Sequence, residues 1–324
     1  MARTRLYRSG DLVLEDFPVD DISEHLGDPS AVVWLDLYRP ESAEFAMVGE
    51  EFGIHQLAIE DARHQGQRPK LDRYRTHEFL SAYAVSVAAD SAELSTHEIA
   101  VFLTRQALIT IRQDDRFPID DVVARWDQSP DLAGHGVGFL LHGLLDQVVD
   151  GHFDAVQALD DRVEELEGLL FEEGRQQIRT VHRRLYTLRK SLVRLRRVVL
   201  PMREVVNTLM RPGMNVVTDP LVPYYQDVYD HVLRAGEQTE SLRDLLESAM
   251  ETNLSAQSNR MNLIMKKVTS WAAIIAVPTA ITGFYGQNLP YPGFSHESGF
   301  IASSAAIVCL SVLLYVVFKR KDWL

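Results

Sequence analysis

Apolar and polar residues follow two different rhythms along the chain, and the change falls near residue 138. Before it, short β-branched and aromatic runs are separated by turn residues, a pattern typical of strands with short connections. Strands are expected at 31–37, 78–89, 98–103 and 107–111, and a helix at 42–52. The last two strands flank Thr104-Arg105-Gln106, which predicts a hairpin. We therefore expect residues 1–137 to form a compact α/β domain.

From residue 138 to 222 the apolar positions recur at helical spacing. Leucine and valine lie three or four residues apart between charges, which predicts two helices at 139–173 and 175–203. The polar positions of the first helix are acidic and those of the second are basic. We expect an antiparallel hairpin hinged at Gly174, with the opposite charges facing each other. Two interpretations of these charges stay open. The charged faces are either solvated or paired with each other, or the acidic helix has a regulatory role.

A much longer helix is predicted over residues 223–286. Between Tyr224 and Val277 there is no proline and only one glycine, Gly236. A helix of this length would span on the order of 95 Å, far more than a globular domain needs. Its last part, from about 268 to 286, carries no charge, and residues 300–318 form a second apolar run. Each is long enough to cross the hydrocarbon core of a bilayer, and the alternative is a buried core hairpin.

The charges beside the two apolar segments predict their orientation. Basic residues precede the first segment and follow the second, at Lys266, Lys267, Lys319, Arg320 and Lys321. The connecting loop, 287–299, contains no lysine or arginine. By the positive-inside rule, both termini, including the basic tail 319–324, are expected in the cytoplasm and the loop outside the cell membrane.

One face of the first apolar segment is narrow and weakly polar. Steps of three and four along it meet Asn262, Met265, Thr269, Ala272, Ala276, Thr279, Gly283 and Gly286. The opposite face carries large residues such as Ile274, Ile275 and Ile281. Small residues at this spacing suit helix packing and pore lining equally. Because two helices cannot enclose a water-filled path, transport would require several subunits.

Composition removes several classes of function. The 324 residues hold 33 Lys and Arg against 46 Asp and Glu, a net charge of −13, which argues against nucleic acid as a partner. The single cysteine, Cys309, excludes a disulfide framework. The glycines of 134–138 have the wrong spacing for a phosphate loop and are expected to form a linker. With no nucleophile–base pair in the sequence either, an enzyme is not expected.

The end of the first apolar segment carries a recognisable motif, Gly283-Phe284-Tyr285-Gly286-Gln287-Asn288. It resembles the Tyr-Gly-Met-Asn signature of the CorA family, two-helix magnesium channels, with Gln287 in place of methionine. Further segments are similar to that family in the same order: Gln67-Arg68-Pro69-Lys70 after Glu60-Asp61, and residues 225–231, 259–266 and 318–324.

The resemblance implies a homopentamer with a funnel-shaped cytoplasmic α/β domain and a pore formed by the first membrane helix of each subunit. It implies that Asn288 binds the incoming hydrated ion at the extracellular mouth, beside Gln287. The other implied pore residues are Tyr285 and Gly286 in that turn, Thr279 and Gly283 below it, Met265, Val268 and Ala276 at an apolar constriction, and Asn262 in a polar ring. Amide oxygens suit Mg²⁺, which gives up its hydration water reluctantly.

The resemblance also implies regulation by the transported ion. Divalent cations would bind between cytoplasmic domains and hold the channel closed, at Asp61 and Glu60 of one subunit and Asp227 of the next, with Asp150 a weaker fourth. The expected function is therefore Mg²⁺ influx down its electrochemical gradient, with Co²⁺ and Ni²⁺ as further candidates. Mg²⁺ would be both cargo and regulator, and no organic cofactor is expected.

The outer loop departs from the family pattern and keeps other functions open. Residues 289–297 lack the acidic Met-Pro-Glu-Leu pattern, and Glu297 stands at a different position. His296 beside Glu297 would favour a softer metal, although an isolated surface histidine is the simpler interpretation. The alternatives are a zinc transporter on the same scaffold and a membrane-anchored scaffold protein.

Overall fold

The computed structural model describes the chain except for residues 1, 171–176, 288–289 and 291–292. The chain divides into two compact units, Met1–Glu247 and Ser248–Leu324. The boundary lies inside one helix, so the sequence of that helix belongs partly to each unit.

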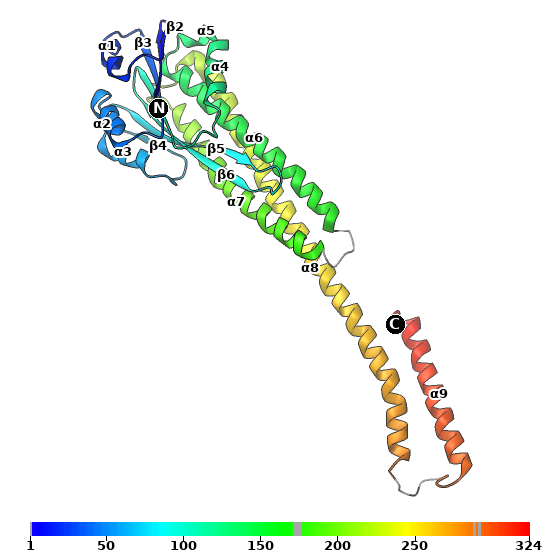
Figure 1. Cartoon of the computed structure of the whole chain (residues 1–324). Coiled ribbons are helices and arrows are strands. Elements are labelled where there is room, and N and C mark those ends of the chain that lie inside the picture. Colours follow the sequence, from blue (N-terminus) through cyan, green and yellow to red (C-terminus); the bar gives the residue numbers. More distant parts are fainter. Residues whose placement is uncertain (1, 171–176, 288–289, 291–292) are drawn as a thin grey trace. The chain divides into compact units, whose positions relative to one another are not determined.

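A mixed sheet organises the first unit (Figure 1). Its described strands lie in the order β2-β1-β3-β7-β6-β5-β4. Their bounds are Ala2–Arg8 for β1, Asp11–Glu15 for β2, Ala31–Tyr38 for β3, Lys70–Arg73 for β4, Glu78–Val87 for β5, Leu94–Leu103 for β6 and Ala107–Arg112 for β7. Of the described strand pairs, β3 and β7 alone run parallel, and the predicted hairpin is confirmed as the antiparallel pair β6–β7.

Short helices cover one face of this sheet. They are η1 (Val19–Asp21), α1 (Ile22–His25), α2 (Ser42–Glu51) and α3 (Gln56–Arg63). Leu35 and Ile109 pair across β3 and β7 and belong to the same buried core cluster as Phe45 of α2. A capping box between Glu41 and Glu44 satisfies backbone amides at the start of α2. These helices enclose one side of the core. Helix α3 also carries Glu60 and Asp61, which are described below.

The other face of the sheet packs against α4 (Ile119–Gln128) and α6 (Val137–Leu170), with the short α5 (Pro130–Ala133) between them. Trp34 of β3 and Trp126 of α4 meet edge to face, with ring centroids 5.0 Å apart. The Trp126 indole donates to the Leu140 carbonyl at 3.1 Å. A Cβ at Gly143 would lie 2.5 Å from the indole nitrogen, so only glycine fits there. This close approach holds α6 against α4.

The same face buries an ion pair between two strands. Arg112 donates to Asp36 at 2.5 Å and 3.0 Å, and the Thr110 hydroxyl donates to Asp36 at 2.7 Å. All three side chains are buried. Because each charge has a partner, the cost of removing it from water is offset. This pair locks the parallel register of β3 and β7.

The predicted helical hairpin forms as α6 and α7 (Gln177–Leu209), which pack together, but its charges are arranged differently from the prediction. Among the described residues, no ion pair joins the two helices. Instead, Lys190 and Arg194 of α7 reach Glu93, and Arg196 reaches Glu240. The inward positions of both helices, such as Leu159 and Leu188, are apolar and buried. The predicted hinge, Gly174, lies outside the described residues.

The expected linker at 134–138 is partly wrong. Helix α6 already begins at Val137, and a Cβ on Gly138 would lie 2.2 Å from the Val216 carbonyl oxygen. The Gly138 carbonyl accepts a hydrogen bond from buried Tyr225 at 2.8 Å. Gly138 therefore serves close helix packing rather than chain flexibility.

The long helix is confirmed as α8 (Val222–Tyr285), preceded by η2 (Asp219–Leu221) and followed by α9 (Glu297–Arg320). In the described part of the chain, two segments are long and apolar enough to span a membrane, Asp219–Tyr285 and Glu297–Arg320. Only 6% and 0% of their apolar windows are buried in the protein. Pro278 lies inside α8, within its apolar part. These helices expose their apolar side chains, as membrane helices do.

Candidate ion path and metal centre

Within the second unit, α8 has one covered side and one open side. In its apolar part, residues 268–285, the buried or half-buried positions are Ser270, Ala273, Ile274, Val277, Pro278, Ile281 and Tyr285. At 100° per residue, these positions share one side of the helix. The weakly polar stripe predicted from the sequence is exposed along its whole length and lies on the opposite side. The stripe therefore faces away from the side that the chain itself covers.

Gly283 and Thr279 of the stripe leave open space and an accepting oxygen on this side of the helix. A Cβ at Gly283 would meet no atom of another described part of the chain within 4 Å, so none of the described contacts requires glycine there. The Thr279 hydroxyl donates to the Ile275 carbonyl at 3.1 Å, which leaves its oxygen free to accept. Ala276 is exposed between them. A narrow, oxygen-bearing surface is thus presented outward.

The residues assigned to the constriction lie further toward the start of the apolar segment. Met265 and Val268 are exposed, like Asn262. Asn262 and Met265 border a cavity of about 620 Å³ together with Lys266 and Trp323. The basic residues before the first apolar segment and the end of the chain after the second therefore lie at the same end of this unit.

The signature turn is described only in part. Helix α8 ends at Tyr285, and the Gly286 amide donates to the Thr282 carbonyl at 2.9 Å. A Cβ at Gly286 would lie 2.9 Å from that same oxygen. The Gln287 amide donates to the Phe284 carbonyl at 3.4 Å. Asn288, the predicted selectivity residue, lies outside the described residues.

The predicted regulatory acids occupy different environments in one chain. Asp61 of α3 accepts hydrogen bonds from Gln67 at 2.9 Å and from Lys70 at 2.6 Å. Burial raises the pKa of Asp61, but these two donors outweigh it and hold the pKa below its usual value. Glu60 and Asp227 are exposed. The structure describes no contact within one chain between Asp61 and Asp227.

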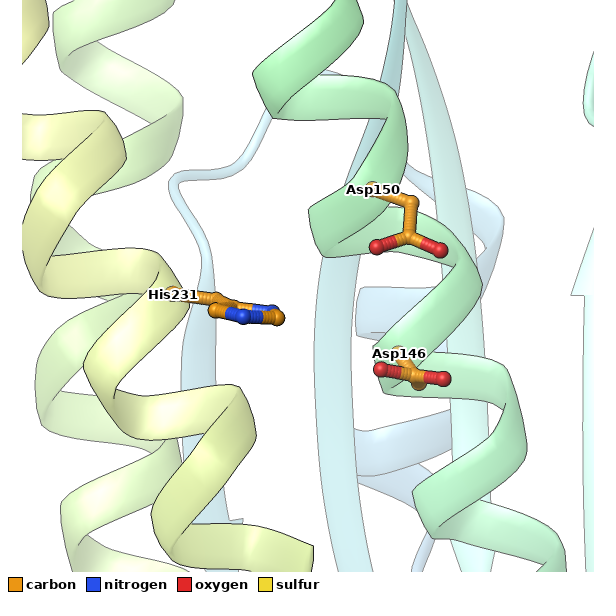
Figure 2. A group of neighbouring side chains, drawn as sticks. All are labelled: Asp146, Asp150 and His231. Carbon is orange, nitrogen blue, oxygen red and sulfur yellow. The ribbon is translucent and has the colours of Figure 1, made fainter.

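Asp150 belongs to a cluster that joins two helices of the first unit. Asp146 and Asp150 lie one turn apart on α6, and His231 of α8 points between them (Figure 2). One ligand atom from each lies within 4.8 Å of the others. Asp227, one turn before His231, has a carboxylate oxygen 3.8 Å from the His231 Nε2 atom. The imidazole Nδ1 atom is buried and has no hydrogen-bond partner among the described residues.

A cation already balances part of this acidic charge. Arg125 of α4 donates to Asp146 through one guanidinium nitrogen and to Asp150 through another. Both contacts use the Oδ2 atoms, so the Oδ1 atoms of the two carboxylates remain available. Two carboxylates with an imidazole suit a divalent ion such as Zn²⁺, Co²⁺ or Ni²⁺ better than Mg²⁺, which prefers oxygen ligands alone.

His142, one turn before Asp146, borders the same cluster. Burial lowers the pKa of His142, and the attraction of Asp146 only partly opposes this effect. Its ring meets Tyr224 and Tyr225 edge to face, at centroid distances of 5.6 Å and 5.7 Å. Burial therefore favours the neutral form of His142 beside the carboxylates.

Sequence reasoning nominated Asp150 but missed Asp146 and His231 as its neighbours. The signal was present as two pairs at i, i+4 spacing, Asp146 with Asp150 and Asp227 with His231. Such pairs show which side chains share a helix face. They do not show that the two faces meet.

Comparison with known proteins gives concordant results. The family model described as CorA-like Mg²⁺ transporter protein matches residues 29–320. The cobalt/magnesium transport protein CorA of Thermotoga maritima is 30% identical over 314 residues, covering 95% of this chain and 89% of that protein. The zinc transport protein ZntB of Cronobacter sakazakii is a more distant relative, 24% identical over 301 residues, with 90% of this chain and 88% of that protein covered.

A solved structure shares the fold over the whole chain. It is the complete structure of the CorA magnesium transporter from Methanocaldococcus jannaschii. The two match with a TM-score of 0.78 and 24% sequence identity, covering 100% of this chain and 99% of that one. At this level of identity the match establishes the fold.

Proposed function

The chain belongs to the family of CorA-like Mg²⁺ transporter proteins, and we propose that it forms a homopentameric channel for Mg²⁺ influx. In this proposal α8 of each subunit lines the pore and α9 lies outside it, in the cell membrane with both termini in the cytoplasm. The domain limits expected from the sequence then assign 1–222 to the cytoplasm and 287–299 to the outside. Co²⁺ and Ni²⁺ are the other candidate ions.

One observation carries the proposal. The small, oxygen-bearing stripe of α8 is exposed and lies opposite the side that the same chain covers. If the stripe served only packing within one subunit, it would be the covered side. Glycine at position 283, where a side chain would meet open space, is explained by neighbouring subunits that approach closely around an axis.

The chemistry of the stripe suits a hydrated divalent ion. Between Asn262 and Asn288 it carries hydroxyl and backbone oxygens but no carboxylate, so an ion would be held through its water shell and released readily. A doubly charged ion entering across 100 mV gains about 4.6 kcal/mol, which is sufficient to drive influx without a nucleotide. We place Asn288 and Gln287 at the entrance, with Met265, Val268 and Ala276 as the constriction.

The proposal is tested by uptake into proteoliposomes that contain a magnesium-sensitive dye. Asn288→Ala is expected to abolish uptake while the oligomer stays intact. Asn207→Ala makes the same change at an exposed position of α7 and should leave uptake unchanged. Normal uptake by Asn288→Ala would remove that residue from the ion path. A wild-type protein that moves no ion at all would favour a membrane-anchored scaffold.

We further propose that cytoplasmic divalent ions close the channel by binding at Asp61 and Glu60 of one subunit and Asp227 of the next. Acids at a subunit boundary repel one another, and a divalent ion turns that repulsion into a bridge. Lys70 partly neutralises Asp61, so Asp227 would complete the site across the boundary. Asp61→Asn with Asp227→Asn should conduct at internal Mg²⁺ levels that close the wild type, whereas exposed Asp20→Asn with Asp90→Asn should not. Unchanged inhibition in the first variant would exclude this sensor.

Zinc transport on the same scaffold is the second candidate, and the observation in its favour is His231 beside Asp146 and Asp150. An imidazole in this cluster favours a softer ion. Uptake measured with Mg²⁺, Co²⁺ and Zn²⁺ in competition separates the two candidates. Zn²⁺ uptake that Mg²⁺ does not reduce would favour zinc as cargo.

A further inference from the structure

The first unit contains a cavity that has no part in the ion path or the metal cluster. It has a volume of about 880 Å³ and lies between α7, the start of β6, and the loops around Gln67 and Asp114. The part of α7 that borders it runs from Arg194 to Pro201. Its volume is typical of pockets for small molecules.

Arginine dominates the lining of this cavity. The five that border it are Arg68, Arg116, Arg194, Arg196 and Arg197. One acid, Asp114, also borders it, bonded to His97 at 2.7 Å. In a chain with a net charge of −13, a cavity lined by five cations and one carboxylate is a local reversal of charge.

Two of these guanidinium groups have no hydrogen-bond or ion-pair partner among the residues that the structure describes. Arg194 approaches Glu93 at 3.8 Å and Arg196 pairs with Glu240, so their charges are partly balanced. The Arg68 and Arg197 side chains make no described hydrogen bond or ion pair. They come from separate elements, the loop before β4 and helix α7. Like charges from distant segments that share one cavity repel, unless an anion lies between them.

The lone acid is positioned by other groups and does not neutralise the arginines fully. Burial raises the pKa of Asp114, but the hydrogen bonds from His97 and from the Arg116 amide outweigh it and keep the carboxylate ionised. The Ser86 hydroxyl lies 3.1 Å from the other ring nitrogen of His97. Asp114 is thus engaged on the sheet side, which leaves Arg68 and Arg197 for a ligand.

We propose that this cavity binds a soluble polyphosphate, such as the phosphate chain of a nucleoside triphosphate. Guanidinium groups bind phosphate oxygens in pairs of parallel hydrogen bonds, and arginine is the residue best suited to this geometry. A single phosphate would use only one or two of the five cations, whereas a chain of phosphates reaches groups on both walls. The proposal stands independently of which ion the protein transports.

The test uses the full-length protein in detergent micelles and inorganic tripolyphosphate as the probe, measured by calorimetry at physiological salt. Arg68→Gln with Arg197→Gln is expected to weaken binding roughly tenfold or more. Arg183→Gln with Arg184→Gln removes the same charge from exposed positions of α7 outside the cavity and should change affinity by less than about twofold. Thermal unfolding of both variants checks that the fold is intact.

Two further measurements sharpen the outcome. ATP that binds more tightly than tripolyphosphate supports a nucleotide in the cavity, and equal affinities support a polyphosphate without base recognition. No binding by the wild type at millimolar concentrations overturns the proposal, as does equal weakening in both arginine variants. Loss of the oligomer in Arg68→Gln with Arg197→Gln, without any polyphosphate binding by the wild type, would assign the cavity to an acidic face of a neighbouring subunit and likewise overturn it.

Discussion

The two units of this chain differ in how far they bury their tryptophan side chains. Trp34 and Trp126 in the first unit are 0% and 2% exposed, whereas Trp271 in the second is 52% exposed. The first unit removes its own apolar surface from water with a sheet and helices. The second leaves a comparable surface open, on helices without charge in their apolar parts. The second unit therefore leaves apolar surface for something other than its own chain to cover, which under the proposed function is lipid and further subunits.

The comparison between the two units is tested most strongly by replacing one tryptophan in each, Trp126 and Trp271. Trp126→Ala should lower the free energy of unfolding of the first unit by about 3–5 kcal/mol, because it empties a site packed against Trp34 and removes the indole hydrogen bond to the Leu140 carbonyl. Trp271→Ala should leave that unit unchanged and alter only insertion or assembly. Thermal unfolding of the full-length variants in micelles is the measurement. Equal losses would show that the two tryptophans are buried alike.

A buried histidine makes the stability of the first unit depend on pH. Burial lowers the pKa of His152 from 6.5 to about 4, although its bond to the Tyr83 carbonyl opposes this. The lowered pKa means that stability is complete above pH 6.5 and falls as the pH drops toward 4, because the unfolded chain takes up the proton first. About 2 kcal/mol should be lost by pH 5.

The measurement is the unfolding temperature between pH 7.5 and pH 4.5 for wild type and His152→Gln. Glutamine can still donate to Tyr83 but cannot take up a proton in this range. The variant should therefore have the shallower pH dependence. Identical slopes would mean that other groups cause the loss.

A larger side chain on the exposed stripe of α8 should narrow the proposed pore and leave the first unit unchanged. Ala276→Leu adds bulk to the exposed stripe, and in an oligomer every subunit would contribute it to the same ring. Mg²⁺ uptake into proteoliposomes should fall roughly tenfold or more. Ala305→Leu, an exposed position of α9, serves as the matched control and should retain uptake. If Ala305→Leu blocks and Ala276→Leu does not, α9 rather than α8 lines the path.

The smallest effect concerns the metal cluster of the first unit. Asp146→Asn should weaken Co²⁺ binding roughly fivefold, since a partly exposed carboxylate contributes about 1 kcal/mol. The visible absorbance of bound Co²⁺ reports affinity and ligand type together. Asp160→Asn changes an exposed acid of the same helix outside the cluster and should have no effect. An unchanged spectrum in Asp146→Asn would exclude this cluster as a cobalt site.

Local patterns predicted the elements of both units well, because each depends on neighbours along the chain. The strand at 31–37, the hairpin of β6 and β7, the long α8 and the apolar α9 follow from spacing and length alone. The facing charges of α6 and α7 were predicted wrongly, since the partners of Arg196 and Lys190 are Glu240 and Glu93, residues that only the fold brings near.

The candidate sites divide in the same way. The stripe of α8 was visible from the sequence because one helix carries all of it. The cluster of Asp146 and His231 was not, since it depends on how α6 packs against α8. The cavity beside Arg68 and Arg197 joins a loop and a helix about 130 residues apart, for which helical periodicity gives no sign.

Pro278 gives α8 a property that the rest of the helix lacks. Its ring has no amide hydrogen to donate to the Ile274 carbonyl, so one rung of the hydrogen-bond ladder is missing within the apolar part of the helix. The Thr282 hydroxyl donates back to the Pro278 carbonyl at 2.9 Å, which reinforces the turn that follows. Helix α8 should therefore bend most easily at Pro278, and the regularly hydrogen-bonded segments before and after it should stay straight.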